Sequence, residues 1–185
     1  RRAVERLGAR ATGAQAATLT VANPGFELDA PNSNEFFFGA PAGWQVIDPN
    51  NLLALAGNVT GTLDTVLSPD YFNPGEATGD VAIIFIGDSQ GGGEVGLRQS
   101  LADSLAANTR YTLSVDVGNI RSGTTVNGTF FNLEGFPGYR IELVAGDQVI
   151  AQTSDDDTAP IGEGEFDTVV LEHVTGASPA QLGET

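Results

Sequence analysis

Asn108-Thr-Arg-Tyr-Thr-Leu-Ser-Val-Asp-Val-Gly-Asn119 and Gly135-Phe-Pro-Gly-Tyr-Arg-Ile-Glu-Leu-Val-Ala-Gly146 are the two stretches that decide the fold class of this chain. In each, apolar side chains occupy alternate positions, beginning at Tyr111 and at Tyr139. Because successive side chains of a β-strand point to opposite faces, this pattern predicts strands with one face on a core and the other in water. Asn, Gly and Pro-Gly bound both segments, as turn residues do. Together the segments predict an antiparallel β-sandwich.

The rest of the chain predicts further short strands separated by turns. The nearly continuous apolar run at 81–86 is typical of a strand buried on both faces, and residues 103–108 predict a helical turn. About eight strands in all favour a jelly roll over residues 18–185. Residues 1–17 predict an N-terminal arm, either helical, flexible or a donor segment. The remaining predicted strands are 18–21, 95–101, 149–153 and 168–173.

The composition excludes several classes of protein. The 185 residues suffice for one domain with a core. There are 24 acidic residues against 8 basic ones, all Arg, for a net charge of −16. Such a surface repels phosphate backbones, which argues against nucleic-acid binding. It attracts cations, and oxygen ligands favour Ca²⁺; simple solubility is the alternative explanation.

Sequence features also bear on the compartment. The chain has no Cys, which excludes disulfides, zinc–thiolate sites and thiol catalysis. No stretch approaches the roughly 18 apolar residues of a membrane span. Ala14-Gln-Ala16 resembles the end of a signal peptide, although no apolar region precedes it. The sequons at Asn58 and Asn127 predict glycosylation of an extracellular protein, though sequons also arise by chance.

Calcium is the metal that the acidic residues favour. Candidate ligands are Glu27, with the oxygens around Asn23, and Asp116 on a predicted strand. The acidic run at 155–157 lacks the Gly and the terminal Glu of an EF-hand loop, so a solvated turn is its alternative reading. The candidate ligands in this acidic loop are Asp155, Asp157, Glu163 and Glu165.

Aromatic residues are the candidates for ligand binding. The single Trp44 is interpreted as a core or edge residue, with sugar stacking as the alternative. The only His, His173, has no Ser or Cys partner pattern and is not interpreted as a catalytic base. With so many acids, no carboxylate pair stands out as a glycosidase pair. The aromatic candidates for glycan binding are Trp44, Phe36, Phe37, Tyr71 and Phe72.

Asn23-Pro-Gly-Phe-Glu27 and Gly43-Trp44, with the two segments quoted first, resemble a family of secreted bacterial β-sandwich domains. That family includes PEP-CTERM-type exported proteins and the Stig cyclases of hapalindole-type alkaloid biosynthesis. Its wider fold is that of galactose-binding-like carbohydrate-binding modules. The resemblance covers residues 18–182 and implies a jelly roll with structural Ca²⁺, bound in part by Glu27.

Two departures from the cyclases shape the functional prediction. Phe85 stands where their active site has a Tyr, and their proposed acidic Asp belongs to a strand beyond this chain's last residue. A cyclase needs a positioned proton donor. We therefore expect a non-catalytic protein, either a self-assembling filament or surface-layer subunit or a glycan-binding module. The alternative is a Stig-like cyclase acting on an indole–isonitrile–terpene substrate, with Phe85 in its ligand site.

The self-assembly hypothesis depends on an open sheet edge. A sandwich without its last strand can accept a strand from another copy, here the N-terminal arm, and form a homo-oligomer. A chain that is incomplete at its C-terminus is the alternative explanation of the same pattern.

Overall fold

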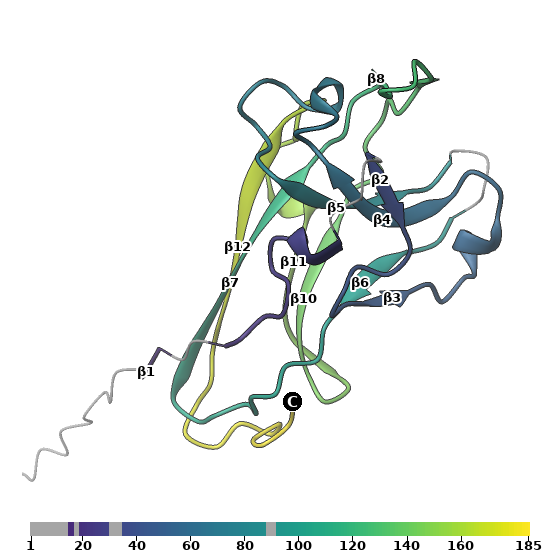
Figure 1. Cartoon of the computed structure of the whole chain (residues 1–185). Helices are drawn as coiled ribbons and strands as arrows, with labels where there is room; N and C mark the ends of the chain where they lie inside the picture. Colours follow the sequence, from purple (N-terminus) through teal and green to yellow (C-terminus); the bar gives the residue numbers. More distant parts are fainter. Residues whose placement is uncertain (1–14, 17–18, 30–34, 88–91) are drawn as a thin grey trace, which may run out of the picture.

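The computed structural model describes residues 15–16, 19–29, 35–87 and 92–185. Within them the protein is an all-β, antiparallel jelly-roll sandwich with short 3-10 helices in its loops (Figure 1). The strands are β1 (Gln15–Ala16), β2 (Phe36–Phe38), β3 (Gln45–Ile47), β4 (Val59–Asp64), β5 (Asp80–Phe85), β6 (Gly96–Arg98), β7 (Thr109–Gly118), β8 (Gly123–Thr124), β9 (Phe130–Phe131), β10 (Arg140–Ala145), β11 (Gln148–Ser154) and β12 (Phe166–Val174). The 3-10 helices are η1 (Glu27–Asp29), η2 (Leu52–Ala54), η3 (Pro69–Tyr71) and η5 (Asp155–Asp157).

One face of the sandwich is built on the long strands β7 and β12. They pair antiparallel along their length, with Leu171 opposite Leu113. β1 lies on the other edge of β7 and runs parallel to it. The β10–β11 hairpin packs beside β12 through β11 (Figure 1). Its register shifts between Leu143 and Val144, a bulge of the kind that bends a strand.

The opposite face consists of β2, β4 and β5, together with the β3–β6 pair. β4 lies between β2 and β5, so that inward side chains align in rows, for example Phe36, Leu63 and Val81. Gly61 is required where β2 passes β4, because a Cβ atom there would overlap the carbonyl oxygen of Phe37. The rows bring apolar side chains of three strands onto the inner face.

Two clusters of buried side chains close the two ends of the sandwich. The backbone N–H of Ala106 donates to the Tyr111 hydroxyl at 2.7 Å and fixes the loop before β7. Val169 and Leu171 of β12 are buried as well, whereas the inward side chains in the middle of β7 are only half-buried. The cluster near the end of β7 consists of Leu63, Tyr71, Phe72 and Ile83. The cluster near its beginning consists of Leu105, Tyr111 and Ala145.

The predicted fold class is confirmed, and three local predictions are wrong. Ile84 on β5 is 39 % exposed, so the run at 81–86 is not buried on both faces. Residues 103–108 form no helix, because Leu105 exchanges backbone hydrogen bonds with residues 183 and 184 instead. Residues 19–21 of the predicted strand 18–21 form no strand, and Thr18 lies outside the described residues.

The predicted N-terminal arm lies outside the described residues except for Gln15 and Ala16, which form β1. These two residues pair with β7 of their own chain, at Thr109 and Arg110. In the part of the chain that the structure describes, no helix has the length and apolar character needed to cross a membrane.

Candidate active site

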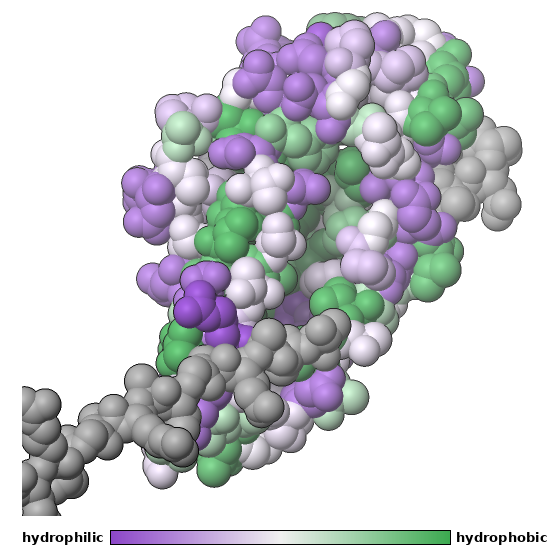
Figure 2. Space-filling view, turned by 90° about the vertical axis from the view of Figure 1, so that its left-hand side faces the viewer, coloured by the Kyte–Doolittle hydropathy of each residue, from purple (hydrophilic) through white to green (hydrophobic). Residues whose placement is uncertain are grey.

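A large cleft runs between the two faces of the sandwich. Its volume is about 2510 Å³, and both faces contribute to its walls. Figure 2 shows the molecule hollowed on one side, with hydrophobic side chains inside the hollow. Small-molecule pockets are typically about 300–1,000 Å³. The cleft therefore has room for a bulky polycyclic ligand.

Strand alternation explains why the cleft is apolar. Inward positions of strands from both faces meet across it, and most of these side chains stay half-buried because no further layer fills the space between them. The rows are Leu113, Val115 and Val117 from β7, Ile141 and Leu143 from β10, and Val81, Ile83 and Phe85 from β5.

Aromatic rings add flat surfaces to this lining. The rings of Phe36 and Phe38 stack with centroids 5.8 Å apart and planes 4° apart. Phe38 is 62 % exposed and Phe131 44 % exposed, and both line the cleft together with Phe85. Open aromatic faces at a concave surface are suited to contacts with flat apolar rings or with positive charge.

An ion-pair network joins the two faces at the cleft. The Nη1 and Nη2 atoms of Arg140, at the start of β10, contact the two carboxylate oxygens of Glu94 at 2.6 and 2.8 Å. Nε of Arg140 contacts Glu142 at 2.7 Å. The hydrogen bond from Arg140 lowers the pKa of Glu94, so this carboxylate is ionised at neutral pH and is not a proton donor there.

The loop that begins at Asn23 is fixed by its own polar groups. Asn23 and Phe26 have positive φ angles of 48° and 61°. The Asn23 side chain donates to the carbonyl of Ala42 at 3.0 Å, and its backbone carbonyl accepts the indole N–H of Trp44 at 3.2 Å. The Trp44 ring also packs on Phe26, with centroids 5.5 Å apart. Trp44 thus anchors this loop and lines the cleft as well.

Glu27, the predicted calcium ligand, lies against the start of β5. Its Oε1 accepts the backbone N–H of Asp80 at 3.0 Å, and a Cβ atom at Gly79 would overlap this carboxylate. Asp80 is 8 % exposed, and its Oδ2 has no hydrogen-bond partner among the described residues. Burial, and then the charges of Glu27, Asp64 and Asp29, raise the pKa of Asp80. A bound cation would stabilise both carboxylates here.

The other predicted metal ligands are in different places. Asp116 lies on the outer face of β7 and accepts the hydroxyl of Thr168 at 2.6 Å. Asp155 accepts the backbone N–H of Tyr139 at 3.1 Å, and Asp157 caps η5. Within the described ranges, no three Asp, Glu or His side chains converge as a metal-binding group. The structure therefore does not bring these three carboxylates into one site.

The predicted ligand-binding aromatics separate into two groups. Trp44 and Phe85 line the cleft. Tyr71 is fully buried in the cluster at the end of β7 and does not line it. Burial, followed by the charges of Glu35 and Asp70, raises the pKa of Tyr71 to about 12.

The two sequons differ in their surroundings. Asn58 is 6 % exposed, and its side chain donates to the carbonyl of Leu52 at 2.8 Å and accepts the N–H of Gly87 at 2.9 Å. A glycan on Asn58 would have no room unless this buried side chain moved. Asn127 is exposed in the hairpin between β8 and β9, where a glycan would meet no such obstacle.

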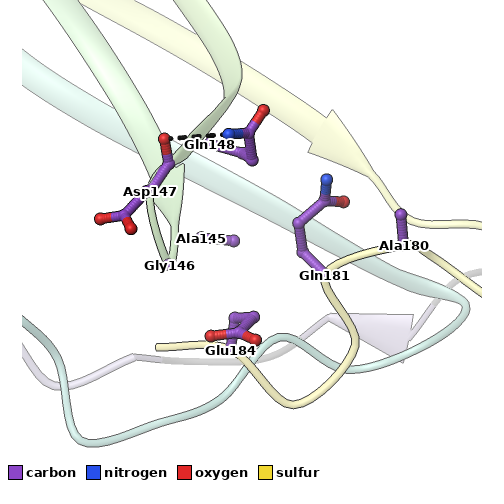
Figure 3. A pocket seen from close by; sticks show the side chains of 7 residues that line it. All are labelled: Ala145, Gly146, Asp147, Gln148, Ala180, Gln181 and Glu184. Carbon is purple, nitrogen blue, oxygen red and sulfur yellow. Dashed lines mark hydrogen bonds between the residues drawn. The ribbon is translucent and has the colours of Figure 1, made fainter.

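A smaller pocket of about 300 Å³ lies at the turn between β10 and β11 (Figure 3). The side chain of Asp147 points away from Gln181 across it. Its lining has no aromatic side chain, and its polar groups do not converge on one point. The lining residues are Ala145, Gly146, Asp147, Gln148, Ala180, Gln181 and Glu184. The cleft is therefore the better candidate for the active site.

Two features of the cleft had no sequence signal. Glu27 and Asp80 are 53 positions apart, and Glu94 and Arg140 are 46 apart. Neither spacing belongs to a motif, because strands that are distant in the chain create both contacts.

The molecule is thus a β-sandwich with a large cleft, walled in part by aromatic rings, between its sheets. The profile of the HpiC1 cyclase family matches residues 17–185. The chain belongs to that family.

Solved structures agree with this assignment. The chain is 32% identical to the Stig cyclase Fisc from Fischerella sp. TAU in complex with (3Z)-3-(1-methyl-2-pyrrolidinylidene)-3H-indole, over 90% of this chain and 83% of that one, with a TM-score of 0.75. It is 32% identical to a cyclase from the same organism in complex with 4-(1H-indol-3-yl)butan-2-one, over 91% and 84%, with a TM-score of 0.75. An apo cyclase from Fischerella sp. is 31% identical over 90% of this chain and 82% of its own, with a TM-score of 0.73. Among curated proteins no match was found.

These matches correct the functional prediction. The expected non-catalytic role, as a self-assembling subunit or glycan-binding module, is wrong, because the family and these relatives are cyclases. The absence of one phenol at Phe85 does not outweigh a match over residues 17–185. The resemblance to Stig cyclases is confirmed, whereas the matches give no support to the likeness to PEP-CTERM-type proteins.

Proposed function

We propose that the protein is a cyclase that binds an indole-bearing substrate in the cleft and closes a ring on it. The observation that carries the proposal is the match of residues 17–185 to the HpiC1 cyclase family. Two cyclase structures at 32% identity contain indole ligands substituted at position 3, a 3H-indole in one and a 1H-indole in the other. The cleft of this chain offers suitable surroundings, with apolar rows and the open rings of Phe38, Phe85 and Phe131.

The chemistry that this lining supports is ring closure through a positively charged intermediate. An aromatic face attracts a desolvated cation by about 2 kcal/mol. The apolar rows of β7 and β10 keep water away from an intermediate that water would quench. Phe85 has no acidic proton. Its role is therefore to shape the cleft and stabilise the cationic intermediate, and it does not protonate the substrate.

We further propose that a calcium ion binds beside Glu27 and Asp80. The buried Oδ2 of Asp80 has no hydrogen-bond partner in the described part of the chain, and its carboxylate lies among like charges, which suits a hard cation. Ca²⁺ takes six to eight oxygen ligands and accepts backbone carbonyls and water. Two carboxylates can therefore serve without a third acidic side chain. Such an ion would hold the loop at η1 against β5, where Glu27 and Asp80 both line the cleft.

Incubation with an indole–isonitrile–terpene substrate and calcium tests the cyclase proposal. We expect a new product of the same mass as the substrate, because ring closure is an isomerisation, and NMR should show the new ring. Protein unfolded by heat is the control. Recovery of unchanged substrate from folded, calcium-loaded protein would contradict the proposal.

A further inference from the structure

Asn119 continues the inward row of β7 into the following loop. Leu113, Val115 and Val117 occupy alternate positions of the strand and line the cleft, and Asn119 is the next position of the same parity. Asn119 also lines the cleft and is 4 % exposed. It is therefore a buried polar side chain at the end of an apolar row.

Three hydrogen bonds hold Asn119 in one orientation. Its backbone N–H donates to the carbonyl of Glu165 at 3.0 Å, and its backbone carbonyl accepts the N–H of Gly164 at 2.7 Å. Its side-chain Nδ2 donates to the carbonyl of Ile161 at 3.0 Å. All three partners belong to the segment before β12. The side-chain amide plane is thus fixed before any ligand arrives.

The side-chain oxygen of Asn119 is left without a donor. Among the described residues, Oδ1 is buried and has no hydrogen-bond partner. The amide cannot be turned over to relieve this, because Nδ2 is needed for the carbonyl of Ile161. Buried acceptors are almost always paired, and an unpaired one is costly. The expected donor is a molecule that enters the cleft.

We propose that Asn119 Oδ1 accepts a hydrogen bond from an N–H group of the ligand and so selects ligands that carry a free aromatic N–H. This inference rests on the proposed function and adds a requirement to its substrate class. Of the two ligands in the relatives' structures, 4-(1H-indol-3-yl)butan-2-one, called the indole ketone below, carries such an N–H group, whereas the 3H-indole does not. An amide does not ionise at neutral pH, so Asn119 is a specificity-determining residue and takes no part in proton transfer.

Two ketones of the same shape test the inference. The first is the indole ketone, and the second has a benzofuran oxygen in place of the indole N–H. With calcium-loaded wild-type protein, calorimetry should give an affinity about tenfold higher for the indole ketone, because the oxygen analogue leaves Oδ1 unpaired. Asn119→Leu should bind both ketones equally well.

Asn132→Leu is the matched control. Asn132 also lines the cleft, but its Oδ1 already accepts the hydroxyl of Ser122 at 3.1 Å and the N–H of Glu134 at 3.2 Å. This variant should keep the preference for the indole ketone. Equal affinities in wild-type protein, as when water satisfies Oδ1, would overturn the inference. So would a preference that survives in Asn119→Leu.

If Asn119→Leu does not fold, an NMR experiment on wild-type protein tests the proposed hydrogen bond. In the complex with ¹⁵N-labelled indole ketone, the indole N–H proton should show a nuclear Overhauser effect to the side-chain amide protons of Asn119. A bound indole ketone without this effect overturns the inference and leaves the cyclase proposal standing. If the indole ketone does not bind at all, the result contradicts the proposed function as well.

Discussion

Asp80 carries a buried carboxylate oxygen that no described residue of the protein satisfies. Asp80→Asn removes a charge that Glu27, Asp64 and Asp29 disfavour, so without calcium the variant should be at least as stable as wild type. Calcium at about 100 times its Kd should raise the melting temperature of wild type by about 5–10 °C. The variant should lose most of this increase. Thermal unfolding with calcium and with a chelator measures both effects.

Asp116→Asn is the control for this experiment. Its carboxylate lies on the outer face of β7 and contacts Thr168, so this variant should respond to calcium as wild type does. An unchanged calcium response in Asp80→Asn, or a lost one in Asp116→Asn, would contradict the proposed metal position.

The buried hydroxyl of Tyr71 should make the free energy of unfolding depend on pH in the alkaline range. Its pKa rises from 10.0 to about 12 on folding. Above pH 10 the unfolded chain loses the proton first, so the free energy of unfolding should fall between pH 10 and about pH 12. The hydroxyl is also buried, and no described residue bonds to it. Tyr71→Phe should therefore raise the free energy of unfolding by about 1 kcal/mol at neutral pH and weaken the alkaline loss.

Urea unfolding at neutral pH and at about pH 11 checks this prediction. Tyr139→Phe is the comparison, because the Tyr139 hydroxyl is bonded to Thr158 at 2.7 Å. A Tyr71→Phe protein that is less stable than wild type at neutral pH would show that its hydroxyl has a favourable partner.

Among the contacts between elements, the one between β2 and β4 leaves the least room for a larger side chain. A methyl group at Gly61 would overlap the carbonyl of Phe37, so Gly61→Ala should force the strands apart and lower the free energy of unfolding by about 3 kcal/mol. Gly96→Ala on β6 is the control, because a Cβ atom there meets nothing within 4 Å. Urea unfolding of both variants measures the difference. Equal stabilities would mean that β2 can shift without cost.

Elements were predictable from the sequence where alternation is long. β7 and β10 carry several alternating apolar residues. The predicted alternation, which begins at Tyr111 and at Tyr139, starts and ends within two residues of the ends of these strands. The prediction failed at 103–108, where a helix-like composition is overridden by backbone bonds of Leu105 to the C-terminal segment. It also missed β4, where Thr and Gly interrupt the apolar alternation, and the short strands β2, β3, β8 and β9, which lack room for a pattern.

The candidate site was less predictable than the elements. Trp44, Glu27 and Phe85 were identified because they belong to motifs or strands of a known family. Asp80 and Asn119 carry no local pattern. Their importance comes from burial and from unpaired oxygens, which exist only once distant strands have assembled. Sequence periodicity therefore located the walls of the cleft but not its polar groups.

At the scale of the whole molecule, the two end clusters keep the sheets apart and leave the cleft between them. We propose that ring closure takes place in this cleft. Val115 lines it from the middle of β7, whereas Val170 on β12 is 55 % exposed and does not line it. A Trp at position 115 would project into the middle of the cleft, while a Trp at position 170 would face solvent.

The most direct test compares Val115→Trp with Val170→Trp in the incubation with an indole–isonitrile–terpene substrate and calcium, after circular dichroism has shown both to be folded. We predict that Val170→Trp forms the cyclised product at the wild-type rate and that Val115→Trp forms less than about a tenth of it. Equal product from the two variants, or none from wild type, would contradict the claim that this cleft is a cyclase active site.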